Sequence, residues 1–226
     1  MPHHRHEVST VSSTVPALPE PDPRFDITQE SQLHALFPAP NQASLAKELD
    51  HVDAHYAAWI RAAPFLVLCT AGKDGLDASP RGDPAGFVEV ADAKTLLLPE
   101  RRGNHRLDSV RNLLVDPRVA LLFLIPGQGE TLRVNGRARI STDPAFLARF
   151  ELHGQPPKLV LAIHVEAAFF QCSRALVRSD LWNPERHVAR GTLPSPGKIL
   201  ADATAGGIDG AAYDRDLPGR VRSTLY

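Results

Sequence analysis

The sequence has 226 residues, of which 43% are hydrophobic, and its formal net charge is −1 at pH 7. This composition suits one globular domain with extensions, and the near-neutral charge excludes an overall basic or acidic protein of the kind that binds nucleic acid or a charged membrane surface. The N-terminus lacks a secretory signal, no apolar run is as long as a membrane span, and the two cysteines form no disulfide framework or zinc site, so we expect a cytoplasmic protein with no metal.

The first part of the chain is expected to hold an extension and two helices. Residues 1–26 are rich in proline, serine and charge, which is typical of disorder. Residues 28–37 predict a short helix with Thr28 as its N-cap. Apolar residues at spacings of three and four predict a longer helix over residues 44–63, with Ser44 as its N-cap.

Strand signals then dominate, because apolar and β-branched runs alternate with turns that contain glycine or proline. Seven such runs are residues 64–71, 76–83, 87–90, 95–98, 118–126, 130–140 and 158–172. Cys69, inside the first run, is expected to be a small core residue. The pattern predicts a mainly β fold, an antiparallel barrel with flanking helices.

Helices are expected between some of these runs, over residues 104–115 and 143–152, and residues 173–182 after the last run predict a short helix or a turn. Asp143 is the expected N-cap of the second, with Pro144 at its first helical position. A tail rich in proline and glycine follows. We therefore divide the chain into a disordered extension (1–26), a barrel domain with N-terminal helices (27–183) and a C-terminal extension (184–226).

The stretch "PERRGNHRLDS" is the clearest chemical signal, because it places arginines at the expected start of a helix. Backbone N–H groups and the helix dipole favour an anion there. Arg101 and Arg106 add positive charge, and Asn104 and Ser109 add neutral donors. The alternative is a solvated basic loop in which Asn104 only caps the helix.

The stretch "ASPRGDPAGF" is the second signal. Ser79, Arg81 and Asp83 alternate, so they can project from one face of a strand. The alternative is an edge strand bent by prolines, with an Arg–Asp pair on its surface. Metal-ligand patterns are weak, and His164 is a single histidine on an alternating strand.

Several of these stretches, taken together and in order, resemble the pyridoxamine 5′-phosphate oxidase-like FMN-binding split barrels. The resemblance is closest to a bacterial branch called PPOX-class FMN-dependent enzymes. The stretches that carry it are "SPRGDPAGFV" (Ser79–Val88), "LPERRGNHRLDSVRNLLVDPRVALLFLIPG" (Leu98–Gly127), "ETLRVNGRARI" (Glu130–Ile140) and "RSDLW" (Arg178–Trp182). The resemblance implies a six-stranded antiparallel Greek-key split barrel that forms a homodimer with two FMN sites in its interface.

The resemblance also implies a set of cofactor-binding residues. Arg101, Asn104, Arg106 and Ser109 are expected around the FMN phosphate. Ser79 and Arg81 are expected at the phosphate or the ribityl chain, and the backbone of Leu98 and Pro99 at the flavin ring. Arg133 is expected close to the cofactor, and Arg178 and Trp182 are expected to act from the partner subunit. These positions are Ser79, Arg81, Leu98, Pro99, Arg101, Asn104, Arg106, Ser109, Arg133, Arg178 and Trp182.

The expected function is therefore an FMN-dependent oxidoreductase that acts on a small molecule, with a nicotinamide as a possible electron donor and no catalytic residue assigned. True pyridoxamine phosphate oxidases carry an Arg-x-x-Leu-Leu-Lys-like strand where this chain has "ASPRGDP", so vitamin B6 oxidation is not expected. The alternatives are a non-catalytic protein that binds flavin, deazaflavin or haem, with His164 as the haem ligand, and a structural dimer with an empty barrel.

Overall fold

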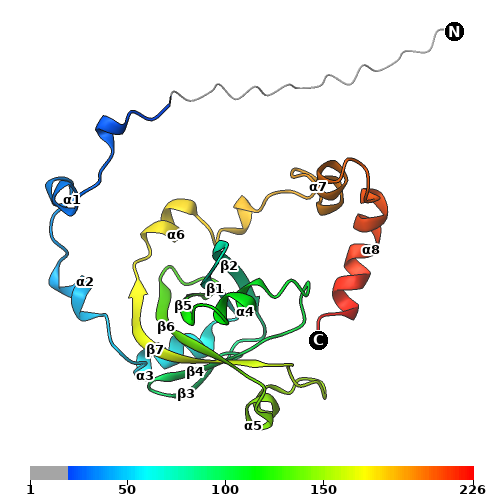
Figure 1. Cartoon of the computed structure of the whole chain (residues 1–226), viewed down its shortest axis with the longest axis horizontal. Helices are drawn as coiled ribbons and strands as arrows, with labels where there is room; N and C mark the ends of the chain where they lie inside the picture. The colour runs from blue at the N-terminus through cyan, green and yellow to red at the C-terminus, as the bar shows by residue number, and fades with distance from the viewer. Residues whose placement is uncertain (1–19) are drawn as a thin grey trace, which may run out of the picture. The chain divides into compact units, whose positions relative to one another are not determined.

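The computed structural model describes residues 20–226 of the chain (Figure 1). The chain divides into two compact units, Met1–Asn41 and Gln42–Tyr226. Of the extension expected to be disordered, residues 1–19 lie outside the described residues.

The described part of the first unit contains two short helices. They are the 3₁₀ helix η1 (Pro23–Phe25) and helix α1 (Glu30–Leu36). The side chains of Gln29 and Gln32 form a reciprocal capping box at the start of α1. The short helix expected over residues 28–37 is thus confirmed, but Gln29 is its N-cap in place of Thr28.

The second unit is built on one antiparallel sheet of seven strands. They are β1 (Phe65–Gly72), β2 (Gly75–Gly82), β3 (Glu89–Asp92), β4 (Thr95–Pro99), β5 (Arg118–Leu124), β6 (Thr131–Ser141) and β7 (Val160–Gln171). Their order across the sheet is β2-β1-β5-β6-β7-β4-β3. This arrangement with its flanking helices confirms the expected mainly β split-barrel class. The resemblance implied six strands, and the sheet has seven. Among them is the short β3, which pairs with β4 through an irregular register.

One row of alternating side chains from these strands forms the main core. Its fully buried members include Leu66, Leu68, Leu96, Leu98, Leu121, Phe123, Leu132, Val134, Leu161 and Ile163. We call this side of the sheet the inner face. Cys69 points to the opposite, outer face and is only half-buried, so its assignment to the core is wrong.

The long helix expected over residues 44–63 is interrupted in the structure. It is divided into α2 (Gln42–Ala46) and α3 (Ala54–Ala62). Between them Leu49 pairs with Ala168 of β7 through two backbone hydrogen bonds of 3.0 and 2.8 Å. The N-cap of α3 is Asp53, whose side chain accepts a hydrogen bond from the backbone N–H of Tyr56. The apolar residues do recur at helical spacing, but the backbone pairing of Leu49 with β7 replaces the middle of the expected helix.

The helix expected over residues 104–115 is also shorter in the structure. Helix α4 covers Asp108–Leu113, and the residue before it, Leu107, has a left-handed backbone with φ of 58°. The Asn104 side chain accepts a hydrogen bond from the backbone N–H of Arg106 at 3.0 Å, so it stabilises a turn before the helix. The expected helix N-terminus at Asn104 is therefore wrong.

The remaining helices lie after β6. Helix α5 (Pro144–Leu147) is capped by Asp143 as expected and continues into the 3₁₀ helix η2 (Ala148–Phe150). Phe150 packs with Leu97, Val160 and Ala162 in a second, smaller core on the outer face. Helix α6 (Arg174–Ser179) confirms the short helix expected after the last strand.

The C-terminal region holds more helix than a tail rich in proline and glycine predicts. It contains the 3₁₀ helix η3 (Pro184–Arg186), helix α7 (Pro196–Ala203) and helix α8 (Gly210–Ser223). No helix within residues 20–226 combines the length and the apolar character needed to cross a membrane.

Gly136 tests the packing of β6 against β7. It lies at the register shift between these strands, and a Cβ added there would come 2.0 Å from the backbone oxygen of His164. We expect Gly136→Ala to lower the free energy of unfolding by about 1–3 kcal/mol, because backbone atoms must move to make room. Urea denaturation measures this, with Gly82→Ala in β2 as the control, since the nearest atom there would be 3.4 Å away. Equal stability of the two variants would contradict the close approach.

Candidate functional site

Strand β2 carries a row of polar side chains on the inner face of the sheet. Asp77, Ser79 and Arg81 lie opposite buried residues of β1 in the strand register and are themselves half-buried. Since β2 is an edge strand, its free side is open to contacts with other segments. The segment that follows β4 and the start of α4 make these contacts.

Arg81 forms the first contact between β2 and the segment after β4. Its Nη1 lies 2.6 Å from both carboxylate oxygens of Glu100. The two side chains are only 16% and 14% exposed, so solvent screens this ion pair weakly. The Nε of Arg81 is buried and has no hydrogen-bond partner in the described structure. Arg81 therefore keeps one unsatisfied donor inside the protein.

Arg101 and Asp83 form a second contact between the same two segments. Here the segment after β4 supplies the arginine, and the residue after β2 supplies the acid. The Nε of Arg101 lies 2.7 Å from Oδ2 of Asp83, whose side chain is 2% exposed. The Nη1 of Arg101 donates a hydrogen bond of 2.8 Å to the backbone oxygen of Phe150. Each segment thus contributes one arginine and one acid, and we call Arg81, Asp83, Glu100 and Arg101 the paired-arginine cluster.

The start of α4 adds a third contact to β2. The hydroxyl of Ser109 donates a hydrogen bond of 2.7 Å to Asp77, and Ser109 is buried. Arg106 instead points to solvent, with its side chain 73% exposed and paired with Asp108 at 2.7 Å. This hydrogen bond raises the pKa of the Arg106 guanidinium. Ser109 is therefore fixed beside the β2 row, whereas Arg106 and the exposed Asn104 lie outside it.

The other predicted cofactor residues lie in different parts of the sheet. Leu98 and Pro99 are buried in β4, and Leu98 contributes to the main core. Arg133 lies on the outer face, with its guanidinium 4.9 Å from the ring centre of Phe169. Ser79 and Arg81 belong to the inner face, so one chain does not bring Arg133 to them.

The C-terminal pair of predicted residues follows β7. Arg178 is exposed on α6. The indole N–H of Trp182 donates a hydrogen bond of 2.6 Å to the backbone oxygen of Gln128, in the turn between β5 and β6. Asp180, which follows α6, pairs with Arg186 at 3.5 Å.

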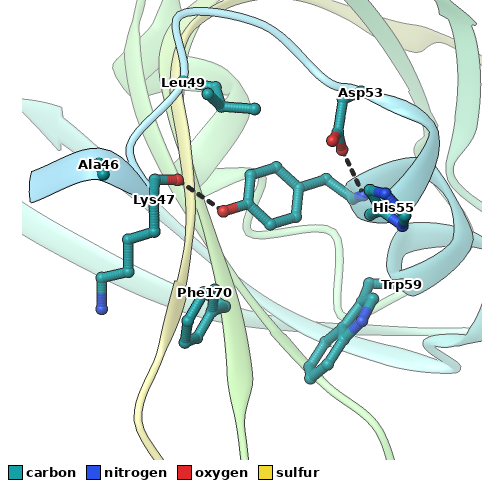
Figure 2. Close-up of a pocket in the computed structure, with 8 residues that line it drawn as sticks. Ala46, Lys47, Leu49, Asp53, His55, Trp59 and Phe170 are labelled. Carbon is teal, nitrogen blue, oxygen red and sulfur yellow. Dashed lines mark hydrogen bonds between the residues drawn. The ribbon is translucent and has the colours of Figure 1, made fainter. Parts of the chain in front are cut away.

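Two pockets lie away from all the residues that were predicted to bind the cofactor. The first, of about 350 Å³, lies between Lys47, Tyr56, Trp59 and Phe170 (Figure 2). There the Tyr56 hydroxyl donates a hydrogen bond of 2.6 Å to the backbone oxygen of Lys47. None of the predicted cofactor residues lines this pocket or the second one.

The second pocket, of about 450 Å³, lies on the outer face beside Arg137, Arg139 and His164. His164, the expected haem ligand of the alternative hypothesis, is exposed there and has cationic neighbours. No group of three or more histidine, cysteine, aspartate or glutamate residues within residues 20–226 is arranged to hold a metal ion.

Two residues of the site were not assigned from the sequence. In the sequence, Glu100 lies between the end of β4 and the two arginines that follow it. An acid next to two arginines is a pattern that could have identified it as a partner for an arginine. Tyr226, the last residue of the sequence, donates a hydrogen bond of 2.9 Å from its hydroxyl to Oδ1 of Asp83, and this bond raises the pKa of the hydroxyl. No local pattern could connect two residues that are so far apart in the chain.

A family model described as pyridoxamine 5′-phosphate oxidase matches residues 52–172, more than half of the chain. This segment runs from just before α3 to the end of β7, and it contains the whole paired-arginine cluster. No curated protein sequence matches the chain.

Similar solved structures each cover about half of the chain. The chain is 20% identical to HupZ from Group A Streptococcus, over 54% of this chain and 95% of that one, with a TM-score of 0.45. It is 16% identical to general stress protein 26 from Bacillus anthracis, over 50% and 88%, with a TM-score of 0.38. It is 11% identical to an FMN-binding protein from Syntrophomonas wolfei, over 52% and 87%, with a TM-score of 0.40.

The Arg81–Glu100 pair is tested by removing Arg81 alone and then both members together. Arg81→Met leaves the half-buried Glu100 carboxylate without its cation, so we expect the free energy of unfolding to fall by about 3 kcal/mol. Arg81→Met combined with Glu100→Gln removes both charges and should recover part of this loss. Urea denaturation of the three proteins without added ligand measures both steps, and a double variant less stable than Arg81→Met would contradict the ion pair.

Proposed function

Because the chain belongs to the pyridoxamine 5′-phosphate oxidase family, we propose that it is an FMN-dependent oxidoreductase that acts on a small molecule. The family supports a flavin-binding split barrel. The observation that carries the FMN assignment is the buried Nε of Arg81, which has no partner in the described structure. A buried donor on a cationic group calls for an anionic acceptor.

The paired-arginine cluster fits a phosphate monoester. Besides Nε of Arg81, the second terminal nitrogen of Arg101, Nη2, has no hydrogen-bond partner within residues 20–226. Glu100 and Asp83 already hold the two guanidinium groups, so little side-chain entropy remains to be lost on binding. The residues present therefore fit the phosphate of FMN, and riboflavin, which has no phosphate, would leave these donors unused.

We assign the remaining cofactor contacts by position. Ser79 and Ser109 flank the cluster on β2 and α4 and would hold the phosphate or the ribityl chain. Asn104 and Arg106, exposed beside them, would close over the phosphate from solvent. The backbone of Leu98 and Pro99 would lie at the flavin ring. Bound FMN would supply hydride-transfer chemistry, and this chain would bind and orient it.

We further propose that two copies of the chain share each cofactor site. Half-buried apolar residues cover part of the outer face, among them Val67, Leu122 and Phe169, and monomeric proteins rarely leave such a face open. A second copy on this face would also explain why Arg133 lies on the opposite side from Arg81. Arg178 and Trp182 would then serve the site of the partner subunit.

The electron donor that we propose is a reduced nicotinamide, and the setting that we propose is the cytoplasm. Neither Cys69 nor Cys172 forms a disulfide, which supports a reducing compartment. We assign no catalytic acid or base, because the cofactor carries the chemistry of hydride transfer.

Arg101→Ala tests where the phosphate binds. The variant removes a charge-assisted hydrogen bond that only FMN can make, so we expect its affinity for FMN to fall about tenfold to a hundredfold. Its affinity for riboflavin should change little. Flavin fluorescence titration of the purified protein without cofactor measures both constants.

Arg111→Ala is the matched control for this experiment. Arg111 lies on α4, is exposed, and has no side-chain partner within residues 20–226. This variant should bind both flavins as the unmodified protein does. Equal losses of FMN and riboflavin affinity in Arg101→Ala would place the phosphate elsewhere.

A mixed dimer tests the sharing of the sites. One subunit carries Arg101→Ala and the other carries Trp182→Ala. If Trp182 serves the site of the partner subunit, one site receives both substitutions and the other receives none, so about half of the FMN sites recover. Counting bound FMN per dimer measures this. A mixed dimer with no intact site beyond those of the unmixed variants would contradict the assignment of Trp182 across the interface.

A further inference from the structure

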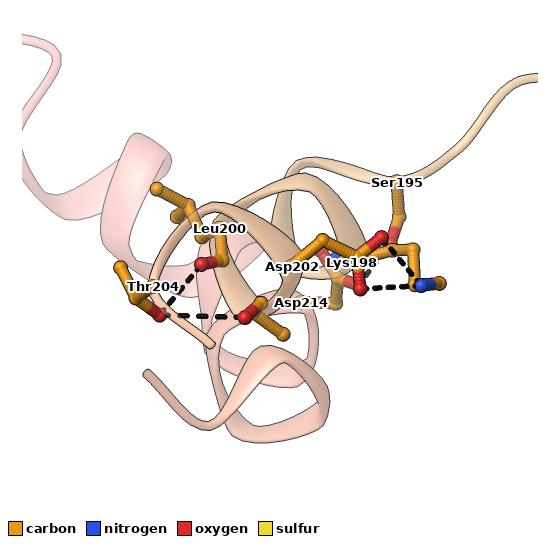
Figure 3. A network of polar contacts seen from close by, with 7 residues as sticks. Ser195, Lys198, Leu200, Asp202, Thr204 and Asp214 are labelled. Atoms are coloured by element: carbon orange, nitrogen blue, oxygen red, sulfur yellow. Dashed lines mark hydrogen bonds and ion pairs between the residues drawn. The ribbon is translucent and has the colours of Figure 1, made fainter. Parts of the chain in front are cut away.

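The C-terminal helices α7 and α8 pack tightly against each other at their starts. A Cβ added to Gly197 would lie 2.1 Å from the backbone oxygen of Gly210, so the two backbones are almost in contact. Asp214 of α8 lies close to Ser195 (Figure 3) and accepts a hydrogen bond from the Ser195 hydroxyl. Its other carboxylate oxygen accepts a hydrogen bond of 2.8 Å from the backbone N–H of Gly197. These contacts fix the direction of α8 relative to α7, and α8 leads to the last residues of the sequence.

Tyr226, at the end of this segment, contacts three separate parts of the chain. Its hydroxyl donates to Asp83, just after β2. Its ring meets the imidazole of His153 edge to face, with 5.5 Å between the ring centres. The guanidinium of Arg101 lies 5.8 Å from the centre of the same ring. Tyr226 is therefore seated against the paired-arginine cluster.

Asp83 connects Tyr226 to Arg101. One carboxylate oxygen, Oδ1, accepts the hydrogen bond from Tyr226, and the other, Oδ2, accepts the one from Nε of Arg101. The Asp83 side chain is 2% exposed, so water does not compete for these positions. With Oδ1 held, the carboxylate cannot rotate without breaking a hydrogen bond, and the plane of the Arg101 guanidinium follows the carboxylate.

The orientation of Arg101 decides what its free nitrogen can reach. Nε is bound to Asp83 and Nη1 to the backbone oxygen of Phe150, and Nη2 is left for a ligand. We propose that Tyr226 is a positioning residue for phosphate binding, which acts through Asp83 to aim Nη2 of Arg101 at the phosphate of FMN. This inference rests on the proposed function and extends the cofactor site to the C-terminal helices.

Tyr226→Phe separates this role from a structural one. The variant keeps the ring that meets His153 and Arg101 and removes only the hydroxyl that holds Asp83. One neutral-to-charged hydrogen bond lost from the support of Arg101 should weaken FMN binding about three- to tenfold. Riboflavin binding should not change, because riboflavin makes no contact with Nη2.

Tyr213→Phe is the matched control. Tyr213 lies on α8, and its ring lies under the guanidinium of Arg220, but its hydroxyl has no hydrogen-bond partner within residues 20–226. This variant should leave both flavin affinities and the unfolding temperature unchanged. Thermal unfolding of Tyr226→Phe verifies that the variant folds as the unmodified protein does.

A double-mutant cycle with Asp83→Asn tests the connection through Asp83. If Tyr226 acts through this carboxylate, adding Tyr226→Phe to Asp83→Asn should weaken FMN binding by less than twofold further. Independent, multiplying losses in the double variant would overturn the inference.

The remaining outcomes separate the two proposals. An unmodified protein that binds riboflavin as tightly as FMN contradicts the proposed phosphate site itself. A clear preference of the unmodified protein for FMN that Tyr226→Phe retains in full overturns only the role of Tyr226. Equal weakening of both flavins in Tyr226→Phe also overturns it, because a loss of local structure would explain that result.

Discussion

The two arginine–carboxylate pairs between β2 and the segment after β4 are the interaction on which the candidate site depends. The sheet ladder does not join these segments, since β2 and β4 are not neighbours in the sheet. Arg81 with Glu100 and Arg101 with Asp83 make the connection instead, each pair having one partner on each segment. The same pairs hold both guanidinium groups in fixed orientations, so a single set of contacts both joins the two segments and forms the basis of the anion site that we propose.

Most of the sheet could be predicted from the sequence, because the alternation of apolar residues reports which side of a strand is buried. The helices were harder. The spacing at residues 44–63 fitted one helix, but Leu49 satisfies its backbone against Ala168 of β7, a partner that lies far along the chain. The left-handed backbone of Leu107 makes α4 begin later in the chain than expected, and a leucine gives no indication of such a conformation.

The candidate site could be predicted in part. Alternation correctly placed Ser79 and Arg81 on one side of β2, and Asp83 follows the strand directly. Ser109 lies beside Asp77 at the start of α4, and its expected role at the FMN phosphate stays a prediction. The pairing of each arginine with an acid was not predicted, since opposite charges in loops have many equivalent partners in a sequence. The contact of Tyr226 with Asp83 depends on how α7 and α8 turn the chain back, which only tertiary packing determines.

The identity of the chromophore that purifies with the protein tests the central claim most directly. The protein is isolated without added cofactor, its visible absorption spectrum is recorded, and the released small molecule is identified by its mass. We expect a flavin spectrum and the mass of FMN, or the same spectrum after FMN is added to a colourless preparation. A Soret band of haem, or a colourless protein that takes up no added FMN, would contradict this account of the site.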